Sequence, residues 1–231
     1  MSLLKKLIKE NSFDNILATT EVSGVVRGLE GSIVETDGFP ASVGSVCEID
    51  SLDAYKTSAE VIGFRNNKNL VALHNTDTKL KVGSRVRLVD EGVNIGVGES
   101  LLGRVIDGMG KPLDGKKLEK FIDYWPLNGK AVNPLERKKI ESKFDVGVRT
   151  INSIITIGKG QRIGIIAGSG VGKSVLLQMM SKYSESDVVV VGLIGERARE
   201  VKIMVDSLLS HDKKNKIIIV AVPADRSPLL R

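Results

Sequence analysis

The sequence has little sulfur, few aromatic rings and no long apolar stretch. Its 231 residues include one cysteine, Cys47, which excludes an internal disulfide and a cysteine-based zinc site. With only two histidines, His74 and His211, we expect no histidine-rich metal centre. The longest apolar runs, Val188–Val191 and Ile217–Val222, are far shorter than the roughly 18 residues that a membrane-spanning helix needs.

The charge and the apolar content are those of a folded protein, which we expect in the cytoplasm. Apolar residues make up 42% of the chain, which is enough for a buried core and argues against disorder. The net charge of +6 permits weak attraction to polyanions without requiring it, because no run reaches five like charges. The N-terminal sequence MSLLKKLIKENSFDN carries lysines inside its apolar stretch and no small-residue cleavage site, so we do not interpret it as a signal peptide.

Three regions follow one another along the chain. In residues 1–20, Leu3, Leu4, Leu7 and Ile8 share one helical face, which predicts either a docking helix or a frayed terminus. Residues 21–91 contain six short alternating segments separated by turn signals, which indicate a small closed barrel or a sandwich. These segments are Val22–Arg27, Ser32–Thr36, Ser45–Asp50, Glu60–Phe64, Asn69–His74 and Ser84–Val89.

Residues 92–231 alternate strand and helix patterns. We predict buried strands at Gln161–Ala167, Asp187–Ile194 and Ile217–Val222, and helices at Lys173–Tyr183 and Arg197–Ser210. Continuous apolar strands separated by helices are typical of a mainly parallel sheet. The fold class is therefore α/β, with a small β-domain before it.

A phosphate-binding loop follows the first of these strands. The sequence AGSGVGKS at 167–174 departs from the strict Walker A pattern only in having Ala167 in place of the first glycine. Its glycines let backbone N–H groups converge on phosphates, Lys173 can neutralise the β- and γ-phosphates, and the Ser174 hydroxyl can bind Mg²⁺. The residues expected to surround the nucleotide's phosphates are Gly168, Ser169, Gly170, Val171, Gly172, Lys173 and Ser174.

Hydrolysis also needs carboxylates. Glu196 follows the strand Val188–Ile194, at the edge of the sheet where α/β folds place ligands, and Arg197 beside it can contact phosphate. A helix-capping carboxylate is the alternative interpretation of Glu196. Asp225 follows Ile217–Val222 and is a second candidate as a magnesium-supporting aspartate, although Pro223 and Ala224 separate it from the strand.

Six motifs in one order resemble a known family. They are GRVIDGMGKPLDG at 103–115, GVRTIN at 147–152, GKGQR at 158–162, the phosphate loop, GERAREV at 195–201 and SPLLR at 227–231. Together they resemble the flagellum-specific ATP synthases, the export ATPases of flagellar type III secretion, and less closely the catalytic subunits of rotary ATP synthases. The similarity covers nearly the whole chain from about residue 21.

The resemblance implies an N-terminal β-barrel, residues 21–91, and a RecA-like ATPase domain, residues 92–231, that assemble into a homohexameric ring. It implies ATP and Mg²⁺ as ligands, Glu196 as catalytic carboxylate, Lys173 and Arg197 near the γ-phosphate, and no magnesium role for Asp225. It also implies that the N-terminal helix binds a stator-like regulatory protein. Further implied partners are the export gate, exported flagellar proteins or their chaperones, and the inner face of the cytoplasmic membrane, touched peripherally.

Family members continue for about as long again, so the resemblance implies an incomplete RecA-like domain and doubtful turnover by these residues alone. The Walker B aspartate, adenine-contacting aromatic, arginine finger and C-terminal helical domain would lie beyond Arg231. Two alternatives are a virulence-type secretion ATPase and a non-catalytic nucleotide-binding module. A nucleic-acid translocase is a third, disfavoured because residues 21–91 offer few stacking aromatics, so we expect no nucleic-acid partner.

Overall fold

The computed structural model describes residues 21–231 apart from positions 53, 54, 76, 77, 93, 120, 128, 130, 169 and 213. The helix expected within residues 1–20 therefore lies outside the described residues. The chain divides into two compact units, one of residues 21–71 and 79–91 and the other of residues 72–78 and 92–231.

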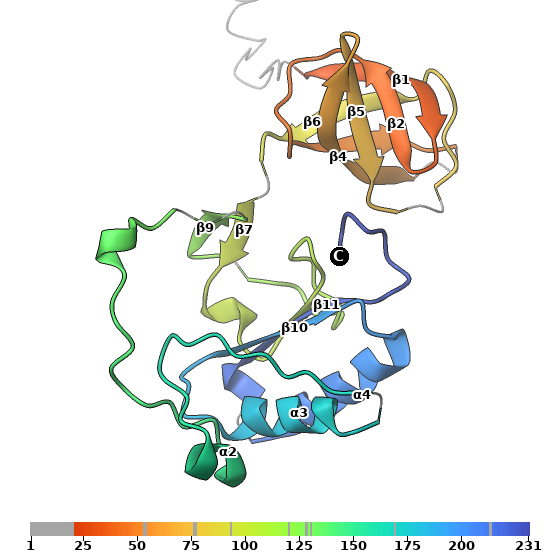
Figure 1. Cartoon of the computed structure of the whole chain (residues 1–231). Coiled ribbons are helices and arrows are strands. Elements are labelled where there is room, and N and C mark those ends of the chain that lie inside the picture. Colours follow the sequence, from red (N-terminus) through yellow and green to blue (C-terminus); the bar gives the residue numbers. More distant parts are fainter. Residues whose placement is uncertain are drawn as a thin grey trace, which may run out of the picture. The chain divides into compact units, whose positions relative to one another are not determined.

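Six strands form a closed barrel in the order β1-β2-β5-β4-β3-β6 (Figure 1). Their bounds are β1 Ser23–Glu30, β2 Ile33–Asp37, β3 Val46–Asp50, β4 Lys56–Arg65, β5 Lys68–Leu73 and β6 Arg85–Asp90. Strand β1 pairs antiparallel with β2 and β6, and β3 pairs antiparallel with β4 and β6. The prediction of a barrel is thus confirmed, although β4 begins four residues before the predicted Glu60.

Every second side chain along strands such as β3 and β4 points into the barrel and fills it. Cys47 and Ile49 on β3, and Ala59 and Val61 on β4, are fully buried, while the residues between them are half exposed. Asn66 and Asn67 join β4 to β5 with φ of 49° and 59°, the conformation that a two-residue hairpin turn requires. The side chains that fill the barrel's described strands are mostly apolar and make a packed core.

The second unit contains a parallel three-stranded sheet in the order β10-β11-β8. These strands are β8 Val105–Ile106, β10 Val189–Ile194 and β11 Ile217–Val222. A separate antiparallel pair, β7 Asn94–Val97 and β9 Asp123–Pro126, precedes the sheet's helices in the chain. The sequence patterns did not predict this pair.

The helices are α2 Arg149–Ile154, α3 Lys173–Tyr183 and α4 Ala198–Leu209, with short 3₁₀ turns η2 Glu99–Leu101, η3 Pro134–Glu136 and η4 Lys214–Lys216. Helix α3 occupies the range that the sequence predicts, and α4 is one residue shorter at each end. Figure 1 shows α3 and α4 side by side. Two apolar clusters hold these elements.

The larger cluster joins α4 to the sheet. Met204 and Leu208 of α4 pack with Leu193 of β10 and with Ile217 and Ile219 of β11. The smaller cluster seats α3, whose Leu176 and Met180 pack against Val146, Val148 and Ile157. Helix α4 therefore buries Met204 and Leu208, whereas α3 packs through residues that are only partly buried. The N-terminal ends of both helices lie beside a cavity that Ser174 and Glu196 line.

Candidate nucleotide-binding site

The predicted phosphate loop lies at the N-terminal end of α3. Gly170 has φ of 77° and Gly172, the residue before the helix, has φ of 95°; side chains other than glycine rarely adopt either value. No other atom lies within 4 Å of where a Cβ would stand on these two glycines, so the loop faces open space. Ser169, also predicted to contact phosphate, lies outside the described residues.

Lys173 and Ser174 occupy the first turn of α3, and both are exposed. The backbone N–H groups of a helix's first turn have no partner within the helix, and the aligned peptide dipoles make that end positive. Gly168 and Val171 are exposed as well. The loop therefore presents N–H donors, an ammonium and a hydroxyl to the same region, which is the donor set that a polyphosphate needs.

The segment that leads into this loop differs from its prediction. Gln161–Ala167 was expected as a buried strand, but it has no regular structure, and Ile166 is fully exposed. Among the described residues no strand pairs with it, and β10 is an edge strand of its sheet. An apolar, β-branched run needs a neighbouring strand to satisfy its N–H and C=O groups, so its sequence alone does not make it a strand.

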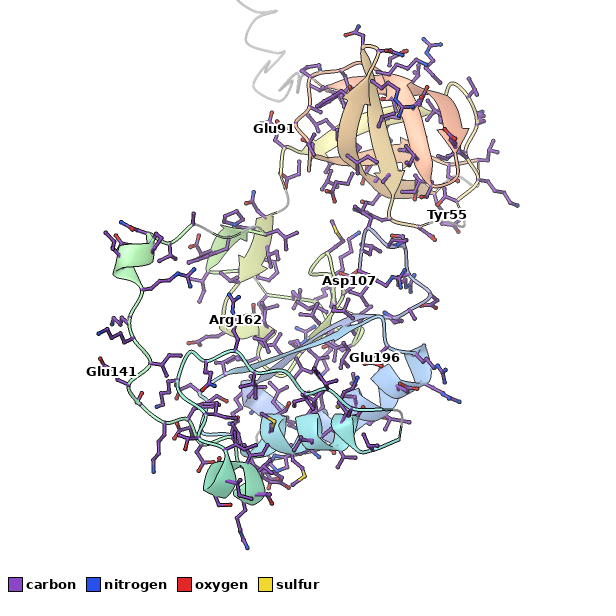
Figure 2. The ribbon with its side chains drawn as sticks, viewed as in Figure 1. Tyr55, Glu91, Asp107, Glu141, Arg162 and Glu196 are labelled. Atoms are coloured by element: carbon purple, nitrogen blue, oxygen red, sulfur yellow. The ribbon has the colours of Figure 1, made fainter. Side chains whose placement is uncertain are left out.

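Glu196 lies directly after β10 and before α4 (Figure 2). The turn begins at Gly195, whose φ of 76° favours glycine and whose N–H donates a 2.8 Å hydrogen bond to the carbonyl of Val222. The N–H of Ala224 donates a 2.9 Å bond to the carbonyl of Glu196. These bonds join the loop after β10 to the loop after β11, which also carries the exposed Asp225.

One cavity brings the two halves of the predicted site together. It has a volume of about 370 Å³ and lies between α3, β10 and α4. Ser174 from the phosphate loop and Glu196 from the β10–α4 loop both line it. Residues of two separate loops thus reach one space, because α3 and α4 both start at the carboxyl edge of the sheet.

Sequence reasoning missed three polar residues of this cavity, Gln178, Ser181 and Glu200. Gln178 follows Ser174 by one helical turn, and Glu200 stands four residues after Glu196. Residues four apart on a helix share a face, so the spacing of Gln178 from Ser174 on α3 was an available signal. Glu196 precedes α4, so its spacing from Glu200 gave no such signal.

Arg197 stands apart from the cavity lining. Its Nη1 lies 3.9 Å from Oε1 of Glu200 in an exposed pair, and its side chain is 70% exposed. A pair of this kind is weakly held in water, so the guanidinium can leave it for a phosphate oxygen.

The oxygen-bearing side chains of the site suit a Mg²⁺ ion that binds together with the nucleotide. Within the described residues, no three His, Cys, Asp or Glu side chains gather closely enough to hold an ion. Mg²⁺ in phosphate sites typically takes one or two protein oxygens and completes its shell with phosphates and water. The Ser174 hydroxyl, exposed at the helix start, fits that pattern.

The fold and the phosphate loop define a P-loop nucleotide-binding chain, and comparison with known proteins places it more closely. Residues 147–231 match the ATP synthase alpha/beta family, nucleotide-binding domain. The matched residues include the phosphate loop and strands β10 and β11.

Flagellum-specific ATP synthases are among the curated relatives of this chain. The chain is 41% identical to that of Pseudomonas aeruginosa over 213 residues, covering 91% of this chain and 47% of the relative. It is 40% identical to that of Aquifex aeolicus over 230 residues, covering 100% of this chain and 51% of the relative. The resemblance seen in the six motifs is confirmed, and the chain spans about half the length of the curated relatives it matches.

Comparison with solved structures supports the same fold. The assembled ATPase EscN of the enteropathogenic E. coli type III secretion system, in complex with its central stalk EscO, aligns with a TM-score of 0.80 at 32% identity. The alignment covers 89% of this chain and 50% of EscN. A barrel followed by a partial nucleotide-binding domain is thereby confirmed as the fold. No helix in the described part of the chain is long and apolar enough to cross a membrane.

Proposed function

We propose that the chain binds ATP with Mg²⁺ as part of an ATP-hydrolysing subunit of a flagellar type III protein export apparatus. The observation that carries this proposal is the shared cavity of Ser174 and Glu196 at the start of α3 and α4. The glycines of the loop and the exposed Lys173 provide the phosphate contacts. The names of the relatives supply the flagellar assignment.

Each site residue has a proposed role. Backbone N–H groups of residues 168–174 hold the β- and γ-phosphates, and the Lys173 ammonium neutralises their charge. The Ser174 hydroxyl holds Mg²⁺, which neutralises phosphate charge when it is bound. The Glu196 carboxylate orients and deprotonates the attacking water. Arg197 swings from Glu200 to stabilise charge on the γ-phosphate.

The wider assignments are proposals on the same footing. The assembled EscN and its stalk EscO support a homohexamer with a regulatory partner for the complete protein. We propose the stator-like partner at residues 1–20, with the export gate and flagellar export substrates or their chaperones as further partners. The proposed location is the cytoplasm, peripheral at the inner face of the membrane.

Two alternatives rest on specific observations. The solved relatives come from the type III secretion system of an enteropathogenic bacterium, which keeps a virulence-type export role as a candidate. The chain covers about half the length of its curated relatives, which keeps a nucleotide-binding module without turnover as the other candidate. The genes that flank the coding sequence separate flagellar from virulence secretion, because the structural genes of each apparatus differ.

Nucleotide binding is the direct test. The chain is titrated with a fluorescent ATP analogue and Mg²⁺, and wild type is compared with Lys173→Ala. We expect binding by wild type and a loss of at least about tenfold in affinity for the variant, which loses the ammonium that faces the phosphates. Lys202→Ala is the control, because Lys202 pairs with Asp206 on the exposed side of α4. A folded wild-type chain that binds no ATP, or a variant that binds equally well, would overturn the proposal.

A further inference from the structure

A polar bridge joins the two helices that carry the site. Nζ of Lys182 on α3 donates a 2.9 Å hydrogen bond to Oγ of Ser207 on α4. The Ser207 hydroxyl in turn donates a 3.0 Å bond to Oε1 of Gln178 on α3. Both bonds are partly buried. We call Gln178, Lys182 and Ser207 the polar bridge.

The bridge lies far along the helices from the reacting groups. Lys182 and Ser207 stand near the C-terminal ends of α3 and α4, whereas Ser174 and Glu196 stand at the opposite ends. Two helical turns and more separate Ser174 from Lys182, which is about 12 Å along the axis. Gln178 connects the two places, because it belongs to the bridge and lines the same cavity as Ser174 and Glu196.

The apolar clusters pack α3 and α4 against different parts of the unit and do not join the two helices to each other. Leu176 and Met180 of α3 pack with Val146, Val148 and Ile157, whereas the buried residues of α4 pack on the sheet. Apolar packing is non-directional, and here the two helices belong to different clusters. Hydrogen bonds are directional, so a hydroxyl that is bonded twice by α3 fixes how far α4 can slide along it.

We propose that Ser207 is a positioning residue, which sets the spacing of the Ser174 hydroxyl and the Glu196 carboxylate across the cavity. This inference rests on the proposed function, because those two groups are proposed to serve the Mg²⁺–ATP complex. The bridge holds α3 and α4 in one position relative to each other, and its loss lets the two helices shift. Binding that depends on Mg²⁺ at Ser174 then weakens, while binding to the loop's N–H groups does not.

Three variants isolate this role. Ser207→Ala removes both hydrogen bonds, and the half-exposed Gln178 and Lys182 can turn to water, so the fold is preserved. Ser207→Thr keeps the hydroxyl and should restore the wild-type behaviour. Ser210→Ala is the matched control, since its hydroxyl donates to the carbonyl of Ser207 within the end of α4 and not to α3.

The experiment measures the affinity of the 231-residue chain for a fluorescent ATP analogue with and without Mg²⁺. Mg²⁺ should raise the affinity of wild type for the analogue. We expect this increase to be about threefold to tenfold smaller in Ser207→Ala, with the Mg²⁺-free affinity unchanged. Ser207→Thr and Ser210→Ala should retain the gain. A Ser207→Ala chain that keeps the full gain, or loses affinity equally without Mg²⁺, overturns the inference alone. A folded wild-type chain that binds no nucleotide overturns the proposed function and this inference with it.

Discussion

The main-chain N–H of Ala224 donates a 2.9 Å hydrogen bond to the carbonyl of Glu196, and so ties the loop after β11 to the loop after β10. The bond constrains the backbone of Glu196 and leaves its side chain at the cavity. Because the backbone of Glu196 is already fixed, ordering its carboxylate against a bound nucleotide costs side-chain entropy only.

Glu196→Gln should separate binding from turnover. The amide has nearly the shape of the carboxylate but cannot accept the proton of water, so we expect ATP affinity within about twofold of wild type. Turnover should fall at least about 100-fold, the usual contribution of a general base. The measurement compares phosphate release in a ring-forming chain of the relatives' full length. Unchanged phosphate release would rule out the proposed role of Glu196.

Gly147→Ala should destabilise the second unit. Gly147 has φ of 73°, and a Cβ there would stand 2.3 Å from the backbone carbon of Tyr183 at the end of α3. Positive φ and this backbone clash together should cost about 2–4 kcal/mol in the free energy of unfolding. Denaturant melts measure this loss. Gly164→Ala is the control, since no atom lies within 4 Å of the place its added methyl group would take; an equal effect of both changes would contradict the prediction.

The Arg104–Asp114 pair should make the free energy of unfolding depend on pH. Nε and Nη2 of Arg104 donate to both carboxylate oxygens of Asp114, at 2.5 and 2.8 Å, and both side chains are largely buried. Hydrogen bonds from Arg104 hold the pKa of Asp114 well below its usual range. A depressed folded-state pKa adds stability above the unfolded pKa of about 3.9, and that stability is lost as pH falls below it.

Asp114→Asn tests this dependence. At pH 7 we expect the variant to lose about 1–3 kcal/mol, because Arg104 keeps its position but loses its charged partner. The difference between the variant and wild type should shrink below about pH 4. Urea melts from about pH 3 to pH 7 provide the measurement, and Asp206→Asn, from an exposed pair with Lys202, provides the control. If the difference in the free energy of unfolding between the variant and wild type is as large at low pH as at neutral pH, the charge of Asp114 is not its cause.

Leu208→Ala should show how strongly α4 holds the sheet. Leu208 is fully buried among Ile217, Ile219 and Leu193. Its truncation removes apolar contacts and leaves a cavity, so we expect a loss of about 2–5 kcal/mol. Ile203→Ala on the same helix, where the side chain is 63% exposed, should cost much less. Similar losses of stability for the two variants in thermal melts would contradict the assignment of Leu208 to the core.

Local patterns predicted most of the elements, because each is decided by nearby residues. Alternating burial predicted the barrel strands, and the apolar run Ile217–Val222 matches β11 in full. Helix α3 matches the predicted range Lys173–Tyr183 in full. The phosphate loop and Glu196 could be proposed for the same reason, since each follows a strand pattern directly.

Elements that depend on distant partners were not predictable. Gln161–Ala167 carries a strand pattern, yet a strand exists only where another strand pairs with it. The β7–β9 pair joins two segments that are far apart in the sequence, and β9 is exposed throughout, so no periodicity marks it. The polar bridge was missed because Lys182 and Ser207 have no local relationship; only the packing of α3 beside α4 brings them together.

The closed barrel is made entirely of strands that end by Asp90, and this has a consequence for synthesis on the ribosome. Its six strands need no later residue to satisfy their ladders. Translation at about 5–20 residues per second takes roughly 7–28 s for residues 91–231 alone. Small barrels fold in milliseconds to seconds. The barrel can therefore finish folding while the nucleotide-binding unit is still being translated, and the slower assembly of the parallel sheet proceeds in a chain whose first unit is already native.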